Sequence, residues 1–541
     1  MTAPPLLAVK DLSITYSGSD YKAVKNVSFV LNQGEKLALV GESGCGKSTI
    51  GRSILQLLPS QTQYEGAIAF EGKNILAMGA QEWRHFRGEV VSLIFQDPMT
   101  RLNPLMTIGD HCLETLQAHQ PQLSRQAAKQ RALECLDRVQ IPASRWSQYA
   151  HEFSGGMRQR VAIALALLLK PKLILADEPT TALDVTVAAE ILAELTRLCA
   201  EDNLGLLLIS HDLAMVGEHC DRLAVMNSGE IVEVGSATAI LSQPQHSYTQ
   251  ILLAAALNPI QTKVEFPENQ SEKPILKLQN VQQYFSLEGN LIQSLWQRQK
   301  QWIKAVDGIN LDIYPGETVG LVGESGCGKS TLSRTILRLM PPTAGQVIFE
   351  GEDLTQLSTQ QMRAKRRQLQ MIFQDPNACL NPMMTVGQSI ADPLIIHGLG
   401  SREEIKSKVM AMLERVELTP TADYFDRFPR QLSGGQQQRV AIARALITNP
   451  KFVICDEPVS MLDARVQSQV LTLMQELKAD FNLTYLFITH DLWVARAFCD
   501  RIAVMYQGKI VELAPTEQLF TQPQHPYTQK LLAAAPALLV A

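Results

Sequence analysis

Two segments of this 541-residue chain, Gly41–Thr49 and Gly323–Thr331, are identical in sequence. Each fits the pattern G-x-x-x-x-G-K-[ST], in which glycines let backbone N–H groups face phosphates, the lysine neutralises phosphate charge and the hydroxyl binds Mg²⁺. The pattern therefore predicts two nucleoside-triphosphate sites. The predicted phosphate-binding residues are Gly41, Glu42, Ser43, Gly44, Cys45, Gly46, Lys47, Ser48 and Thr49, and Gly323, Glu324, Ser325, Gly326, Cys327, Gly328, Lys329, Ser330 and Thr331.

Each predicted loop lies between a strand and a helix in the sequence. Apolar, strand-forming residues precede the loops at 36–40 and 318–322, and helix-compatible residues follow at 50–55 and 332–337. A chance glycine turn would not repeat this context. We therefore interpret both segments as phosphate loops at a helix N-terminus, where the backbone favours anions.

An acidic pair directly follows an apolar run in each half of the chain. The pairs are Asp177-Glu178 and Asp456-Glu457. Beside a phosphate loop, the first carboxylate can hold Mg²⁺ and the second can orient or deprotonate water. A solvated strand end is the alternative that involves no chemistry.

Two further polar residues recur near the ends of apolar runs. Gln96 and Gln374 stand in Phe-Gln-Asp-Pro, where glutamine can coordinate Mg²⁺ and water or simply begin a turn. His211 and His490 can contact a γ-phosphate if they lie at the ligand-binding edge of a parallel sheet, and a structural histidine is the alternative. The predicted catalytic residues are Glu178, Glu457, His211, His490, Gln96 and Gln374. The predicted Mg²⁺ ligands are Ser48, Gln96, Asp177, Ser330, Gln374 and Asp456.

The repeat extends along most of the chain. Lys329 follows Lys47 by 282 positions, and Glu457 follows Glu178 by 279 positions. So small a change in offset indicates two complete copies of one domain. We predict a first domain at residues 1–257, a polar linker at 258–273 and a second domain at 274–541.

The composition limits the partners and the compartment. The net charge is −5 and no long Lys/Arg run occurs, so nucleic acid is a disfavoured partner. The nine cysteines include no C-x-x-C pair, which indicates a reducing compartment. The longest apolar stretch, Val161–Leu169, is too short to span a bilayer, and the first residues lack the features of a signal peptide. We therefore expect that any work at a membrane requires other chains that span it.

The most specific repeated element is a Ser-Gly-Gly sequence that could begin a helix and bind a second anion through its hydroxyl and backbone donors. It is similar to the signature sequences of ATP-binding-cassette (ABC) ATPases, and both halves resemble ABC nucleotide-binding domains over nearly their whole length. The signature residues are Ser154, Gly155 and Gly156, and Ser433, Gly434 and Gly435.

This resemblance implies an α/β fold with two P-loop NTPase cores, each with an antiparallel β subdomain and an α-helical subdomain. It also implies an ATPase that binds ATP and Mg²⁺, and two composite sites in which the phosphate loop of one half meets the signature of the other. An aromatic residue near the start of each half would stack on adenine. Tyr16 matches this position in the first half; in the second half alignment gives Phe285, although Tyr284 is also aromatic.

A tail motif indicates the branch of the family. His-Ser-Tyr-Thr at 246–249 and His-Pro-Tyr-Thr at 525–528 resemble the tail of ATPases from bacterial peptide and nickel importers. The resemblance implies an ATP-hydrolysing subunit of an importer for peptides or related small solutes, at the cytoplasmic face of the bacterial plasma membrane. Its expected partners are two integral-membrane permeases and an extracytoplasmic solute-binding protein. We expect no iron–sulfur cluster, because clustered tail cysteines are missing.

Two other classes of tandem ABC ATPase were weighed against this interpretation. A soluble ATPase acting on ribosomes would join its cassettes by a long, charged helical arm, and a DNA-repair ATPase would need large insertions and zinc-binding cysteines; neither is present in the sequence. The segment 287–304 mixes Trp with basic residues, so it is either a membrane or permease contact or a solvated hairpin or helix. Because both halves keep the lysine, acid and histidine, we expect two competent sites. Their rates could differ, since the first half has Phe153, Met157 and Leu165 where the second has Leu432, Gln436 and Arg444.

Overall fold

The computed structural model describes residues 4–18, 21–96, 101–180, 183, 185–257, 273–286 and 302–533. The chain forms two compact units, unit 1 mainly from residues 1–257 and unit 2 mainly from residues 258–535. The predicted linker, 258–273, lies almost wholly outside the described residues. The domain boundaries given above therefore stay a prediction, and so does the role of the segment 287–304, most of which is also outside the described residues.

The larger sheet of unit 1 is mostly parallel, and its central strands are continuous apolar runs that are buried on both faces. The strand order is β10-β9-β3-β8-β7-β6, with only β10 antiparallel to its neighbour. Its strands are β3 (Lys36–Val40), β6 (Val91–Ile94), β7 (Leu173–Asp177), β8 (Gly205–Ser210), β9 (Arg222–Asn227) and β10 (Glu230–Ser236).

A smaller antiparallel sheet covers one face of the larger one. Its order is β2-β1-β4-β5, and the alternation of buried and exposed residues along β2 shows that one face meets the core and the other meets solvent. Along β3, Leu37 and Leu39 pack toward the smaller sheet, whereas Ala38 and Val40 pack toward the helices on the other face. The strands are β1 (Leu7–Thr15), β2 (Lys22–Leu31), β4 (Gln63–Phe70) and β5 (Lys73–Asn74).

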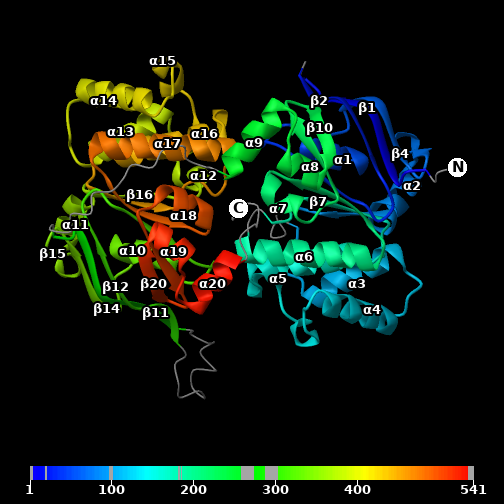
Figure 1. Cartoon of the computed structure of the whole chain (residues 1–541), viewed down its shortest axis with the longest axis horizontal. Coiled ribbons are helices and arrows are strands. Elements are labelled where there is room, and N and C mark those ends of the chain that lie inside the picture. Colours follow the sequence, from blue (N-terminus) through cyan, green and yellow to red (C-terminus); the bar gives the residue numbers. More distant parts are fainter. Residues whose placement is uncertain are drawn as a thin grey trace. The chain divides into compact units, whose positions relative to one another are not determined.

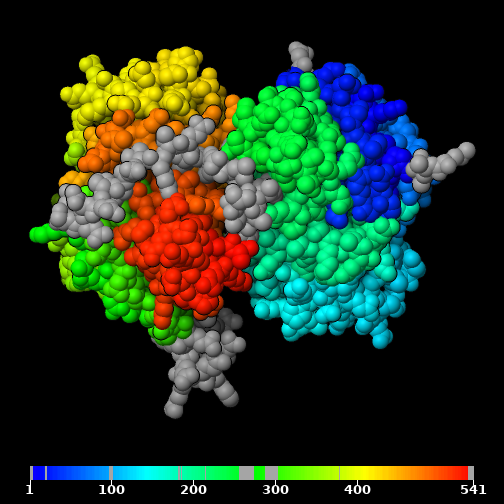
Figure 2. All heavy atoms as spheres, viewed as in Figure 1, coloured from blue at the N-terminus to red at the C-terminus, as the bar shows by residue number. Residues whose placement is uncertain are grey.

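The helices of unit 1 form a separate layer, in which α3, α4 and α5 pack on one another. In Figure 1, α3 and α4 lie at one end of unit 1 and β1, β2 and β4 at the other. Figure 2 shows α4, in cyan, on the surface of the unit. The helices are α1 (Lys47–Ile54), α2 (Ala80–His85), α3 (Ile108–His119), α4 (Arg125–Arg138), α5 (Gly155–Leu167), α6 (Val185–Glu201), α7 (Leu213–Gly217), α8 (Ala237–Ser242) and α9 (Ser247–Leu257).

Unit 2 repeats this architecture. Its sheets have the orders β16-β17-β18-β13-β19-β20 and β12-β11-β14-β15, which match those of unit 1 strand for strand. The strands are β11 (Leu276–Ser286), β12 (Trp302–Ile313), β13 (Thr318–Val322), β14 (Ala344–Phe349), β15 (Glu352–Asp353), β16 (Leu369–Ile372), β17 (Phe452–Asp456), β18 (Thr484–Thr489), β19 (Arg501–Tyr506) and β20 (Lys509–Pro515).

The helices of unit 2 again form a layer, and α14, in yellow, lies on the surface of the unit in Figure 2. The helices are α10 (Lys329–Ile336), α11 (Thr359–Lys365), α12 (Pro376–Cys379), α13 (Val386–Ile396), α14 (Arg402–Arg415), α15 (Thr421–Phe425), α16 (Gly434–Leu446), α17 (Ala464–Phe481), α18 (Leu492–Phe498), α19 (Thr516–Thr521) and α20 (Pro526–Ala533). The predicted fold, an α/β core with an antiparallel β part and a helical part in each half, is confirmed. Within the described residues, no helix has both the length and the apolar composition needed to cross a membrane.

Candidate functional site

The order of the parallel strands brings the predicted residues of each unit together. In unit 1 the strands β3, β8, β7 and β6 are neighbours, in that order. The phosphate loop follows β3, His211 follows β8, Glu178 follows β7 and Gln96 lies just after β6. Because parallel strands end at one edge of the sheet, residues far apart in sequence meet at this edge.

The phosphate loop of unit 1 has a backbone that requires glycine at two positions. Gly46, which begins α1, has φ +103°, and a Cβ at this position would lie 2.5 Å from the carbonyl oxygen of Ala23. A Cβ on Gly41 would lie 2.3 Å from the carbonyl oxygen of Met226. The loop is thus closely packed against β2 and β9, and any larger residue would displace it.

The loop lysines are buried and bind their own loops. Lys47 Nζ donates to the carbonyl oxygens of Gly41 and Glu42 at 2.7 and 2.8 Å. Lys329 Nζ makes the same two bonds, to Gly323 at 2.6 Å and to Glu324 at 3.0 Å. These carbonyls hold each ammonium group at the loop, close to where phosphates would bind.

The predicted metal ligands of each loop pair with the first acid. Ser48 Oγ donates to Asp177 at 2.7 Å, and Ser330 Oγ donates to Asp456 at 3.2 Å. Burial raises the pKa of both carboxyl groups above the ordinary value. A cation here would relieve the cost of burying each carboxylate, so the donor set fits Mg²⁺.

The described residues contain no group of three or more His, Cys, Asp and Glu side chains that could hold a metal. This does not conflict with the proposed Mg²⁺ ligands. Magnesium usually takes one or two carboxylates, and water and substrate phosphates complete its coordination.

The second acid of each pair is held by the glutamine and the histidine. In unit 1, Gln96 Nε2 donates to Glu178 at 2.9 Å, and His211 Nδ1 lies 3.4 Å from the same carboxylate oxygen. Although burial acts to lower it, the hydrogen bond and the charge of Glu178 hold the pKa of His211 above its ordinary value. The three side chains form one cluster at the edge of the sheet.

Unit 2 reproduces this cluster. Gln374 Nε2 donates to Glu457 at 2.7 Å, and His490 Nδ1 lies 3.2 Å from it. Burial acts to lower the pKa of His490, but the hydrogen bond to Glu457 raises it overall. Burial acts to raise the pKa of Glu457, but the bond from His490 and the charges of His490 and Lys329 lower it overall. The carboxylate is therefore held in its charged form.

The backbone at the second acid is a feature that the sequence analysis missed. Glu178 has φ +48° and Glu457 has φ +49°, a left-handed conformation that is uncommon for residues other than glycine. The amide of Glu178 donates to the carbonyl oxygen of Ile209, and that of Glu457 to Ile488, both at 2.9 Å. This bond to the neighbouring strand helps to hold the strained backbone, which aims the carboxylate at the glutamine and histidine.

The predicted adenine-stacking residues lie outside these clusters. The Tyr16 hydroxyl is 3.1 Å from that of Thr49 at the end of the phosphate loop, so this ring is beside the loop. In unit 2, Phe285 is 39% exposed, whereas the Tyr284 hydroxyl donates to Asp307 at 2.5 Å. The choice of Phe285 stays a prediction.

The signature serines take no part in these clusters, and each caps a helix. Ser154 Oγ accepts a bond from the amide of Met157 at 3.4 Å, and Ser433 Oγ accepts the equivalent bond from Gln436 at 3.4 Å. The Gln436 side chain also accepts a bond from the amide of Ser433 at 3.0 Å, which completes a capping box in unit 2. The following glycines therefore lie in the first turn of α5 and α16.

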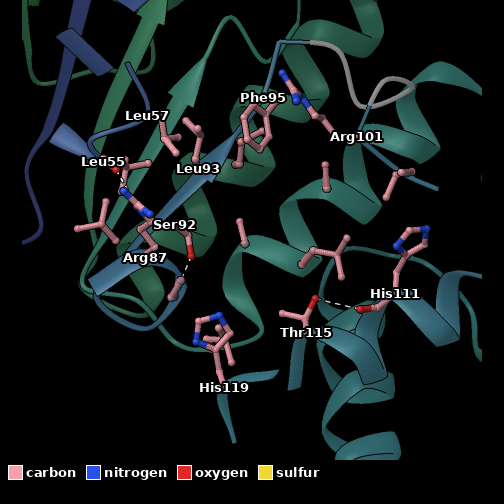
Figure 3. A pocket seen from close by; sticks show the side chains of 18 residues that line it. Leu55, Leu57, Arg87, Ser92, Leu93, Phe95, Arg101, His111, Thr115 and His119 are labelled. Carbon is pink, nitrogen blue, oxygen red and sulfur yellow. Dashed lines mark hydrogen bonds between the residues drawn. The ribbon is translucent and has the colours of Figure 1, made fainter. Parts of the chain in front are cut away.

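A cavity of about 390 Å³ lies beside β6 of unit 1, and we call it the unit 1 groove. Figure 3 shows Phe95 and Arg101 together at one end, with Arg87, Ser92 and His119 toward the other. The Arg101 guanidinium lies 4.4 Å from the centre of the Phe95 ring. The groove was not predicted; it adjoins Gln96, because Phe95 lines it.

The position of Leu165 distinguishes this groove from the same region of unit 2. Leu165 of α5 lines the unit 1 groove. Arg444, the equivalent residue of α16, donates to the carbonyl oxygen of Cys379 at 2.8 Å and lies 3.9 Å from Asp392. An arginine of unit 2 thus extends across a region that is open in unit 1.

Comparison with protein families gives two matches in each half. The family described as "ABC transporter" matches residues 24–181 and 306–460. The family described as "Oligopeptide/dipeptide transporter, C-terminal region" matches residues 232–282 and 511–540. The first match contains both phosphate loops, both signatures and both acidic pairs, and the second contains both His-x-Tyr-Thr motifs.

Two similar curated relatives are named "Glutathione import ATP-binding protein GsiA". The one from Shigella dysenteriae serotype 1 (strain Sd197) is 42% identical over 572 residues, which cover 99% of this chain and 90% of the relative. The one from Escherichia coli (strain K12) is 42% identical over 573 residues, with the same coverage. A solved dimeric ATP-binding cassette with ADP and Pi is 33% identical over 44% of this chain and 98% of its own, with a TM-score of 0.39.

Proposed function

Since the chain belongs to the ABC-transporter family, as a tandem ATP-binding subunit of an importer of the oligopeptide/dipeptide type, we propose that it hydrolyses Mg²⁺-ATP at two sites to drive uptake of glutathione or a related small peptide. The observation that supports two working sites is the complete cluster of acid, glutamine and histidine in each unit. Each unit has all the polar side chains that the sequence predicts for ATP hydrolysis.

The residues of each unit have separate roles in this proposal. Lys47 moves from the loop carbonyls to the phosphates, and the loop amides bind phosphate oxygens. Ser48, Asp177 and Gln96 would hold Mg²⁺, which would neutralise charge on the phosphates. Glu178 orients the attacking water, because Gln96 and His211 fix the direction of its carboxylate. Lys329, Ser330, Asp456, Gln374, Glu457 and His490 act in the same way in unit 2.

We further propose that each ATP site is completed by the signature of the other unit. The helix start at Ser154 or Ser433 offers a hydroxyl, unhindered glycine amides and the positive end of a helix dipole. These donors suit a γ-phosphate. These donors take no part in the acid clusters of their own unit, and the family arrangement gives them a role in ATP binding besides the capping of α5 and α16.

The proposed substrate class comes from the relatives. Their name specifies glutathione import, and 42% identity over nearly the whole chain supports a small peptide of this kind for the present transporter. The proposed roles of the residues described above all concern ATP. Selection would therefore reside in an extracytoplasmic solute-binding protein and in the permeases.

An importer ATPase of this family works with membrane permeases. We propose two permease subunits as partners, with the chain bound peripherally at the cytoplasmic face of the bacterial inner membrane. The unit 1 groove is a suitable contact, because most of its lining residues are apolar, Arg101 lies at one end and Phe95 joins it to Gln96. An occupant could therefore affect the position of the catalytic glutamine.

The test is affinity purification from detergent-solubilised membranes with Glu178→Gln/Glu457→Gln, which should keep ATP bound. We expect two multi-spanning permeases by mass spectrometry, and loss of glutathione-dependent growth or uptake in a strain that has only this variant. Ribosomal proteins without permeases would contradict the proposal. The comparisons give no support to the ribosomal alternative.

A further inference from the structure

The His-x-Tyr-Thr motif has a structural explanation in both units. His246 precedes α9, and its Nδ1 accepts a hydrogen bond from the amide of Tyr248 at 3.1 Å. His525 makes the same 3.1 Å bond with the amide of Tyr527 at the start of α20. Each histidine therefore accepts a bond from a backbone amide that has no partner within the helix. The residue between the histidine and the tyrosine is the first of the helix, a position that favours proline, and in unit 2 it is Pro526.

A glutamate on the antiparallel edge strand of the larger sheet fixes each motif. Glu233 of β10 accepts bonds from the amides of Gln245 and His246 at 2.8 and 3.1 Å. Glu512 of β20 accepts the equivalent bonds in unit 2, at 2.9 and 3.0 Å. The start of the tail helix is thus attached to the sheet, and the tyrosine has a defined direction.

This direction is toward the phosphate loop. The amide of Glu42 donates to Tyr248 Oη at 3.3 Å, and the amide of Glu324 donates to Tyr527 Oη at 3.1 Å. Both tyrosines are buried, with exposed fractions of 7% and 8%. A residue more than 200 positions away in the chain therefore contacts the second residue of each loop.

The loop lysine contacts the same residue from its other side. Lys47 Nζ donates to the carbonyl oxygen of Glu42, while Tyr248 Oη accepts from its amide. When ATP binds, the lysine must turn from the carbonyl to the phosphates. The tyrosine hydroxyl can keep its contact with the amide of Glu42 after the lysine has turned.

We propose that Tyr248 and Tyr527 are positioning residues for ATP, which fix the first turn of the phosphate loop and so raise nucleotide affinity. The tail motif is thereby part of the nucleotide site, although it does not touch the nucleotide. A loop that is already in its binding conformation loses less entropy when the ligand binds. This inference rests on the proposed function, since it assumes that the loops bind ATP.

The experiment compares the full-length chain with Tyr248→Phe/Tyr527→Phe, which removes the two hydroxyls and keeps the rings. We expect the Kd for fluorescent ADP and the KM for ATP to rise about fivefold, with kcat changed less than about twofold, because each buried loop amide loses its acceptor. If the two hydroxyls position the phosphate loops, their removal raises KM and Kd. If they only attach the tail helices to their units, their removal lowers the unfolding temperature and leaves KM and Kd unchanged.

The matched control is Tyr485→Phe. Tyr485 is buried and its hydroxyl donates to the carbonyl oxygen of Met474 at 3.1 Å, with no part in the loop. This variant should unfold at a lower temperature and bind nucleotide as the wild type does. Unchanged nucleotide binding in the double variant, or equal weakening in the control, would overturn the inference alone. Absence of nucleotide binding by the wild type would overturn the proposed function as well.

Discussion

The two units differ in the helical layer and agree at the edge of the sheet. The distance from glutamine to acid is 2.9 Å in unit 1 and 2.7 Å in unit 2, and the distance from histidine to acid is 3.4 and 3.2 Å. Both acids also have the same left-handed backbone. The bonds that hold the second acid are therefore the same in both copies.

The helical layers are less alike. Leu165 faces an open groove in unit 1, whereas Arg444 binds the Cys379 carbonyl in unit 2. Met157 and Gln436 differ at the signature helix, and only the second forms a capping box with its serine. The two units therefore share their contacts at the sheet edge and differ in the helical layer.

The largest expected effect tests the equality of the two sites. Glu178→Gln and Glu457→Gln should each reduce steady-state ATPase activity by the same factor, and the double variant should lose about 10²- to 10⁴-fold, since the water-orienting carboxylate is removed. The activity of purified full-length chain measures this. Matched controls are Glu71→Gln and Glu350→Gln, which change surface ion pairs at equivalent positions. Unequal single losses would show that similar geometry conceals different rates.

The second expected effect concerns the difference between the helical layers. Leu165→Arg places in unit 1 the residue type found in unit 2, and the arginine side chain should fill the groove. We expect the amount of co-purified permease to fall about tenfold, which corresponds to a loss of about 1.4 kcal/mol in binding free energy. ATPase activity of the isolated chain should stay within about twofold. Ile251→Arg, an equivalent change at an exposed residue of α9, is the control. If Leu165→Arg captures as much permease as the wild type does, the unit 1 groove is not a contact with the permeases.

The third expected effect is a pH dependence shared by the units. The raised pKa of His211 and His490 means that each charged histidine stabilises the fold below its ordinary pKa of 6.5, and that this contribution is lost as the pH rises through the folded pKa. The unfolding temperature of the nucleotide-free chain should therefore fall as the pH rises above 6.5 and through the folded pKa of the two histidines. The slope should be smaller in His211→Gln/His490→Gln. Identical slopes would mean that the pairs with Glu178 and Glu457 contribute nothing measurable.

At acid pH the same pair behaves in the opposite way. The pKa of Glu457 lies below its ordinary value of 4.5, so its contribution is present above that value and is lost as the pH falls through the folded pKa. The pair in unit 2 therefore stabilises the fold most between these two limits.

The smallest expected effect concerns the capping of the two signature helices, α5 and α16. Met157→Gln would allow residue 157 to accept a bond from the amide of Ser154, as Gln436 does for Ser433. A completed capping box is worth about 0.3–1.5 kcal/mol, which corresponds to an increase of roughly 1–6 °C in the unfolding temperature of unit 1. Differential scanning calorimetry would measure it, and Gln436→Met should lower the stability of unit 2. A decrease with Met157→Gln would show that methionine packing outweighs the cap.

The sequence was sufficient to predict the clustered residues because each of them follows an apolar strand, and these strands are neighbours in the sheet. Once β3, β7 and β8 are assigned to one parallel sheet, the loop, Glu178 and His211 must meet at one edge. The pairing of Ser48 with Asp177 follows from the same rule. The α/β fold of each half was also evident from these strands and from the helices that follow them.

Other features depend on distant backbone contacts, which have no local sequence pattern. The left-handed conformation of Glu178 depends on Ile209 in the neighbouring strand, and the direction of Tyr248 depends on Glu42. At the adenine-stacking residue of unit 2, the choice of Phe285 over Tyr284 stays a prediction, because the pairing of β11 with β12 shifts register after Leu278 and again before Tyr284. The groove could not be predicted, since it arises from how α3 and α5 pack beside β6.

The placement of the nine cysteines makes this chain convenient for labelling. All lie in the described residues as free thiols; eight are buried, and Cys379 is half-buried. Cysteines introduced at Gln130 and Lys408, on exposed faces of α4 and α14, would therefore be the most accessible thiols to a maleimide dye. A donor and an acceptor at these two positions would report, by energy transfer, whether the separation of the units depends on bound nucleotide.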